Sequence, residues 1–210
     1  MYHNVGRCVI TERVDICNIA LSLLGEDPIT SIDDDSNNAK QLKIHYEAAR
    51  DATLEAHDWT FAIERFLPAK LTAEPVYGAA ALFSVPVDIL RVIACDNPSN
   101  VNDPSYGTVK INANEQIDWQ MEAGNIVCNE EVVYARGVKR ITAEGVFSPL
   151  FVEAFAAKLA MMLAVNLTAS ADIQARVTAL YDYTIREAKS RDGLQGRNRR
   201  IRNRTLLKSR

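Results

Sequence analysis

Apolar residues recur every three or four positions near the start of the chain, which is the spacing typical of helices. One such stretch predicts a helix from about Glu12 to Leu24, with Thr11 as its N-cap and Gly25 at its end. A second predicts a helix over 38–57, after the polar run 33–38. Its inward stripe consists of Leu42, Tyr46, Ala49, Thr53 and Ala56.

Helical spacing returns in the last third of the chain. Ser148 followed by Pro149 is a typical helix start, with a capping hydroxyl and a proline in the first turn. Residues 150–167 are apolar on nearly every side, so we expect a central buried helix there. Residues 168–170 break the pattern, and a last helix is expected over 172–191, ended by Gly193.

The middle of the chain has a different period. Strands are expected over 59–67 and 89–95, separated by an Ala- and Pro-rich loop between Pro68 and Pro86. A turn-rich excursion follows over 96–107. Further short strands are predicted over 109–111, 117–121, 126–128, 132–135 and 138–143, with a hairpin turn at Gly124-Asn125. Short strands separated by turns indicate an antiparallel sheet.

These elements predict an α+β fold. The helical segments 11–58 and 147–193 must bury their apolar faces, and packing them together as one bundle does so most simply. The β-rich segment 59–146 is then an insertion in that bundle. Residues 194–210 form a basic C-terminal extension.

Composition places the chain among ordinary globular proteins, with 210 residues, 48% of them hydrophobic and 24% charged. Four scattered cysteines exclude a disulfide scaffold and favour a reducing compartment. The most apolar stretch, 150–167, contains Glu153 and Lys158 and is short of the roughly 20 apolar residues that a bilayer requires. We therefore expect no membrane span, and the N-terminus has no apolar secretory region.

Charge is distributed very unevenly along the chain. Residues 197–210 contain seven bases and no acid, so this tail carries +7, whereas the other 17 bases and 27 acids leave −10 on the body. Such a tail favours a protein partner or nucleic acid, and a disordered solubilising tail is the remaining interpretation. No aromatic residue supports base stacking. The candidate binding residues are Arg197, Arg199, Arg200, Ile201, Arg202, Arg204, Leu206, Leu207, Lys208 and Arg210.

Motifs for metal binding are incomplete. Asp33, Asp35 and Asn37 have the spacing of a calcium loop, but Asn38 stands where that loop needs glycine and Ile44 where it needs glutamate. An acidic helix start is the favoured interpretation. The histidines His3, His45 and His57 have no zinc-helix spacing.

Motifs for catalysis are missing as well. The carboxylate pairs Glu26-Asp27 and Glu130-Glu131 are adjacent, and neighbouring residues on a strand point to opposite faces. The sequence contains no phosphate-binding glycine loop, nucleophile elbow or zinc-protease motif. We therefore expect no catalytic residue, no metal and no cofactor.

Several stretches between Val14 and Gly193 together resemble the tail tubular protein A family, the portal adaptors (head-to-tail connectors) of short-tailed bacteriophages. They are residues 23–26, 28–29 and 31–34, the long helix leading into 59–61, residues 85–93, 124–126, 132–135 and 148–151, and the closing 186–189. The family has no active-site signature, so no catalytic residue is carried over.

The resemblance implies a structural virion protein, not an enzyme. It implies a ring of about twelve subunits under the dodecameric portal. Its partners would be the portal protein ring, other copies of the chain, and a tail nozzle or tail tube protein. Genomic DNA would pass through the channel without specific binding. The location would be the virion neck, after assembly in the host bacterial cytoplasm, and the basic tail would bind the portal.

Two other functions stay open on the residues alone. A nucleic-acid-binding module could use the same tail, although the acidic body would repel a duplex. An enzyme such as a virion-borne cell-wall hydrolase would need carboxylates that converge from distant parts of the chain.

Overall fold

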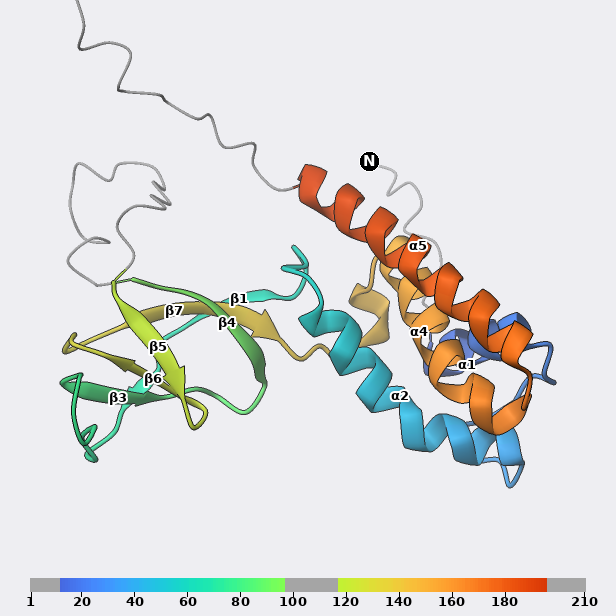
Figure 1. Ribbon diagram of the computed structural model, residues 1–210, viewed down its shortest axis with the longest axis horizontal. Helices are drawn as coiled ribbons and strands as arrows, with labels where there is room; N and C mark the ends of the chain where they lie inside the picture. The colour runs from blue at the N-terminus through green and yellow to red at the C-terminus, as the bar shows by residue number, and fades with distance from the viewer. Residues whose placement is uncertain (1–11, 97–116, 196–210) are drawn as a thin grey trace, which may run out of the picture.

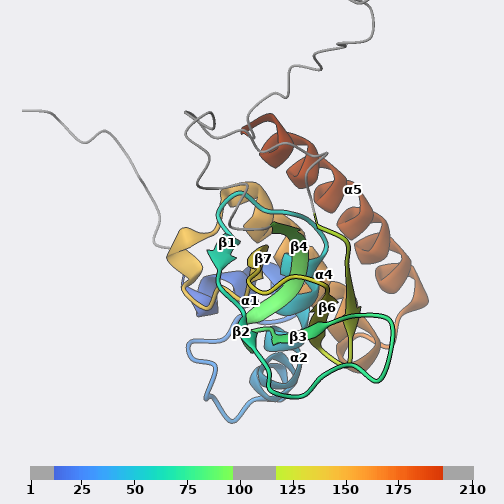
Figure 2. The same ribbon diagram turned by 90° about the vertical axis from the view of Figure 1, so that its left-hand side faces the viewer.

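The computed structural model describes residues 12–96 and 117–195, and these form an α+β fold with four α-helices and two antiparallel sheets. The helices gather at one end of an elongated molecule and the strands at the other (Figure 1). Seen from the strand end, the sheets lie in front of α2 and α4 (Figure 2). The α+β class expected from the sequence is confirmed.

Local capping explains where the first two helices begin and end. Helix α1 (Arg13–Leu24) starts at Glu12, which forms a capping box with Asp15, so Thr11 as the N-cap was wrong. Gly25 ends α1 with φ 80°, a left-handed conformation that glycine adopts without strain. Helix α2 (Asn37–Glu55) starts where Ser36 accepts a hydrogen bond from the Ala39 amide.

The predicted central helix is confirmed as α4 (Pro149–Leu167), with Ser148 as its N-cap. It follows a short 3₁₀ turn, η2 (Glu144–Val146), and contacts α1, α2 and α5. Within the described residues, α4 is the one helix long and apolar enough to cross a membrane. More than half of that stretch is buried within the fold, as in the core helices of globular proteins.

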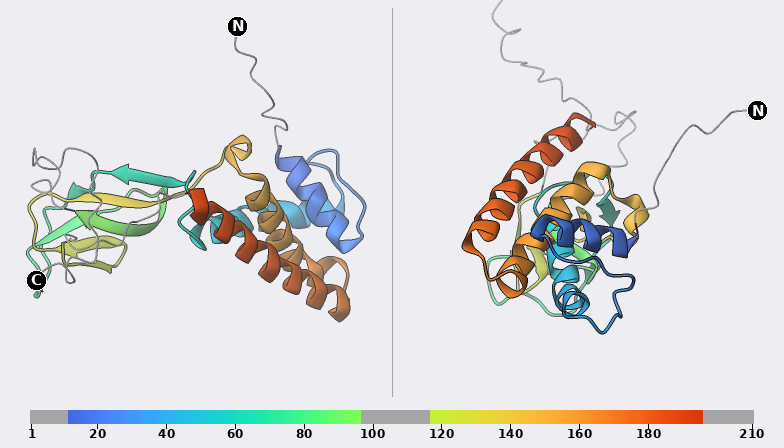
Figure 3. Two further views of the ribbon diagram at one scale, coloured as in Figure 1. Left: turned by 90° about the horizontal axis from the view of Figure 1, so that it is seen from above. Right: turned by 90° about the vertical axis from the view of Figure 1, so that its right-hand side faces the viewer.

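Helix α5 (Ala171–Gln195) runs along α4 and is longer than predicted (Figure 3). Gly193 does not end it, because the helix continues through this residue. A single glycine costs a helix only about 1 kcal/mol relative to alanine, which other contacts of the helix can offset.

The strands form two sheets. One has the order β1 (Ile63–Phe66), β7 (Tyr134–Lys139), β4 (Ile89–Asp96). The other has the order β2 (Ala69–Lys70), β3 (Ala81–Ser84), β6 (Asn125–Cys128), β5 (Trp119–Glu122). The β5–β6 hairpin turns at Ala123 and Gly124, which both have positive φ.

Three predictions in the β region were wrong in detail. Residues 59–62 are not strand, and β1 begins only at Ile63. The expected loop between Pro68 and Pro86 contains β2 and β3. The two strands expected over 132–135 and 138–143 are one strand, β7, which continues through Gly137. The excursion 96–107 and the strand 109–111 lie outside the described residues, apart from Asp96 at the end of β4.

Two groups of buried side chains hold the fold together. The larger one joins the helices and includes Tyr46, Trp59, Phe151 and Phe155. The smaller one lies among the strands and takes residues from both sheets: Ala81, Phe83, Cys95, Ile126, Cys128, Val133 and Ala135. Val138 on β7 belongs to the larger core, so this strand carries residues of both.

Candidate functional site

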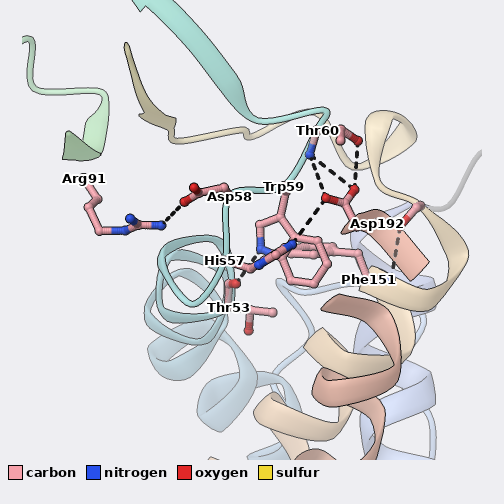
Figure 4. A network of polar contacts seen from close by, with 9 residues as sticks. Thr53, His57, Asp58, Trp59, Thr60, Arg91, Phe151 and Asp192 are labelled. Atoms are coloured by element: carbon pink, nitrogen blue, oxygen red, sulfur yellow. Dashed lines mark hydrogen bonds and ion pairs between the residues drawn. The ribbon is translucent and has the colours of Figure 1, made fainter. Parts of the chain in front are cut away.

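The predicted binding residues of the basic tail, from Arg197 to Arg210, lie outside the described residues. The described chain ends at Gln195, the last residue of α5. What the structure places is therefore the end of the helix from which the tail continues. A network of polar contacts surrounds that end (Figure 4).

Asp192 is the centre of this network and is only 7% exposed, in the last turn of α5. Its carboxylate accepts hydrogen bonds from the Thr60 amide at 3.1 Å and from Thr60 Oγ1 at 2.8 Å. His57 Nε2 lies 3.5 Å from Asp192 Oδ2. The end of α5 is thus joined to the segment between α2 and β1, which is 132 residues away in the sequence.

Trp59 holds the same segment from the inside of the fold. Its side chain is fully buried, and Nε1 donates to the Thr53 carbonyl oxygen at 2.9 Å. The indole packs edge-on against Phe151 of α4, with ring centroids 5.0 Å apart. The sequence placed Trp59 at the start of a strand, but here it closes the helical core, and its neighbour Thr60 reaches Asp192.

Ion pairs connect the outer side of the junction between helices and strands. Arg91 on β4 pairs with Asp58, and Arg140 pairs with Asp51 of α2 at 2.8 Å. Within the β1–β7–β4 sheet, Lys139 Nζ of β7 lies 2.6 Å from Glu64 of β1. These groups are partly exposed, and such pairs typically stabilise a fold by less than about 1 kcal/mol each. The buried Asp192 contacts are therefore the stronger constraint on this junction.

The polar contacts of the junction hold the end of α5 against the segment between α2 and β1. A nucleophilic triad requires a hydroxyl or thiol bonded to the histidine, but Thr60 donates its hydroxyl to Asp192 instead. Among the described residues, no cluster of three or more His, Cys, Asp or Glu side chains could hold a metal ion.

The acidic run before α2 is arranged as a helix start. Asp33 and Asp35 pair with Lys43 and Lys40, at 2.8 and 2.6 Å. Asp34 turns back to the main chain, and the amides of Ser31 and Thr30 lower the pKa of its carboxyl below the ordinary value. These contacts direct the carboxylates to lysines and amides of the protein itself.

Some large apolar side chains of the β region are strongly exposed. Val76 and Tyr77, in the connection between β2 and β3, are 98% and 89% exposed. Val87, before β4, is 92% exposed. Single exposed apolar side chains are common on protein surfaces, whereas a contiguous exposed patch marks a site of contact with another chain.

Sequence reasoning missed both Asp192 and Thr60. One local feature could have indicated Asp192, because an acid in the last turn of a helix opposes the helix dipole and requires a compensating partner. Nothing in the sequence identified Thr60 as that partner.

No protein-family model matches the chain, and no curated protein matches it significantly.

Proposed function

We propose that this chain is a structural virion protein, a portal adaptor that forms a ring between the portal and the tail of a short-tailed phage. The observation that carries the proposal is a +7 segment without a single acid, which continues directly from a helix end anchored by a buried aspartate. Because Asp192 holds the end of α5 in place, the basic segment would start from a fixed point on the molecule. An acidic groove between portal subunits would be its complement.

Within this proposal, the helices on either side of the β region form one bundle, and residues 59–146 are an insertion. The contacts of α4 with α1, α2 and α5 support that arrangement. The exposed Val76, Tyr77 and Val87 suit contacts with neighbouring subunits or with the tail nozzle. The net charge of −10 outside residues 197–210 suits a channel that lets DNA slide through.

The test is binding to the cognate portal ring, followed by native mass spectrometry. We expect each portal to gain about twelve copies of the protein. A full-length variant with all seven tail bases changed to glutamine should bind much more weakly and lose the salt dependence of binding. A control variant with Arg186, Lys189 and Arg191 of α5 changed to glutamine removes three bases from the body and should bind like the wild type.

The outcomes separate the two parts of the proposal. If the wild-type protein does not bind the portal at any salt concentration, the adaptor function is wrong. If the tail variant binds as tightly as the α5 variant, the adaptor function stands and the role given to the tail is wrong.

The same tail also suits a nucleic-acid-binding module. With seven phosphate contacts, the logarithm of the DNA-binding constant would fall with the logarithm of the salt concentration, with a slope no steeper than about −6. Fluorescence anisotropy of a labelled duplex measures that slope directly. Binding to DNA with this slope, together with no binding to the portal, would favour the module over the adaptor.

A further inference from the structure

Two arginines face each other directly on neighbouring strands at the edge of the β1–β7–β4 sheet. Arg65 of β1 and Arg136 of β7 are register partners, and the next residue in that row, on β4, is Ala94. Their side chains share one face of the sheet. Like charges directly opposite each other destabilise a strand pair unless something compensates them.

No carboxylate of the described residues compensates this pair. Neither arginine has a carboxylate of the described residues within 4.0 Å of its guanidinium group. Arg136 Nε is buried and has no hydrogen-bond partner among the residues that the structure describes. By contrast Arg50, Arg91 and Arg140 each contact an aspartate.

Both arginines line one shallow hollow, together with Thr60, Ile63 and Glu64. The polar groups of the other lining residues are already engaged. Thr60 donates its amide and its hydroxyl to Asp192, and Glu64 is held by Lys139. The pKa of Lys139 is raised, chiefly by its hydrogen bond to Glu64, so that carboxylate keeps its cationic partner. The two guanidinium groups therefore remain as the unpaired charges of the hollow.

We propose that Arg65 and Arg136 bind one small oxyanion of the phosphate class. Guanidinium groups donate parallel hydrogen bonds to phosphate and carboxylate oxygens, and a bound anion would also relieve the repulsion between the two cations. A small ion fits better than a polyanion, because the body outside the tail has a net charge of −10. This inference is independent of the proposed function.

The experiment is a titration of the full-length protein with inorganic phosphate at constant ionic strength, maintained with sodium chloride. The Nε–Hε NMR signal of Arg136 is the direct readout, because that group is buried and lacks a partner. We expect the signal to shift saturably, and the thermal midpoint to rise with the same phosphate dependence. A parallel titration with acetate distinguishes phosphate from carboxylate as the preferred oxyanion.

Three variants make the test specific. Arg65→Gln, at an exposed position, should fold normally and weaken phosphate binding about tenfold, the loss expected for one charge-assisted hydrogen bond. Arg136→Lys keeps the positive charge but lacks the planar guanidinium group with its paired N–H donors. It also removes the Nε–Hε signal of Arg136 and so assigns that signal in the spectrum. Arg186→Gln removes an exposed arginine on α5 and should leave binding unchanged.

The basic tail is the same in every variant, so its own affinity for phosphate cancels in the comparison. A shift that stays linear in phosphate would overturn the proposal. Equal phosphate dependence of the thermal midpoint in the wild type and Arg65→Gln would overturn it too. Saturation with acetate alone would replace phosphate by a carboxylate as the ligand.

Discussion

At the scale of single residues, Gly137 shows how one missing side chain lets strands pack closely. It lies in the middle of β7, where β4 has an irregular register. A Cβ at this position would lie 2.7 Å from the Arg91 carbonyl oxygen and 2.7 Å from Ile89 Cγ2. Both distances are well below van der Waals contact, and the carbonyl belongs to the backbone, so it cannot move aside easily.

We expect Gly137→Ala to lower the free energy of unfolding by about 1–3 kcal/mol, the usual cost of overpacking. Urea denaturation followed by circular dichroism measures the change. Gly145→Ala is the matched control, because nothing lies within 4 Å of the added methyl there, and it should leave the midpoint nearly unchanged. Equal midpoints for the two variants would contradict the close contact.

Asp34 is a second single residue with a predictable effect, a contribution to the stability of the fold that depends on pH. Hydrogen bonds from the amides of Ser31 and Thr30 lower its pKa below the ordinary 3.8. A carboxyl whose pKa is lower in the folded state stabilises the fold at pH values above its unfolded-state pKa. That stabilisation is lost as the pH falls through the folded-state pKa.

We therefore expect Asp34→Asn to be less stable than the wild type at neutral pH, and the difference to shrink as the pH falls below 3.8. Urea unfolding of both proteins over a series of pH values measures it. The control is Asp35→Asn, whose side chain is 97% exposed and should make little difference at any pH. A stability difference for Asp34→Asn that does not change with pH would contradict the assignment.

At the scale of elements, the end of α5 depends on a contact from a distant part of the chain. Replacing Asp192 by alanine leaves the Thr60 amide and hydroxyl without their acceptor in a part-buried place. Thr60 is itself an exposed residue, so water can take over part of these contacts, and the net contribution of one such hydrogen bond is about 0.5–1.5 kcal/mol. We expect a loss of this size in the free energy of unfolding, together with faster hydrogen exchange in the last turn of α5.

Asp192→Asn keeps the shape and one acceptor oxygen, so it should lose less stability than Asp192→Ala. Ser190→Ala, at an exposed position two residues before Asp192 on α5, is the control for a substitution to alanine near the helix end. If exchange in the last turn of α5 is unchanged in Asp192→Ala, the anchor does not hold the helix end.

The helices could be predicted from the sequence because their determinants are local. Ser148 with Pro149 starts α4, and Gly25 ends α1, each through groups within a few residues. Strand β3 could not be found this way, since its partner β6 lies more than 40 residues further along the chain. Asp192 and Thr60 meet for the same reason only in the folded protein, so sequence patterns missed the anchor.

At the scale of the whole molecule, the three cysteines of the described residues are divided between the two cores. Cys17 is buried in the helical core, whereas Cys95 and Cys128 are buried among the strands. Burial raises the pKa of Cys17 and of Cys95 to about 12, and it raises the pKa of Cys128 as well. A buried thiol with a raised pKa is protonated and inert, so each cysteine reacts only when its own core opens.

We expect all three thiols to resist iodoacetamide at pH 8 in a Cys8→Ser variant of the full chain, because Cys8 lies outside the described residues. In rising urea, Cys95 and Cys128 should react before Cys17, because the strand core is the smaller one and separate cores can open at different free energies. Mass spectrometry of the labelled peptides follows each site. Identical urea dependence at all three sites would mean that β7, which carries residues of both cores, joins them into one cooperative unit.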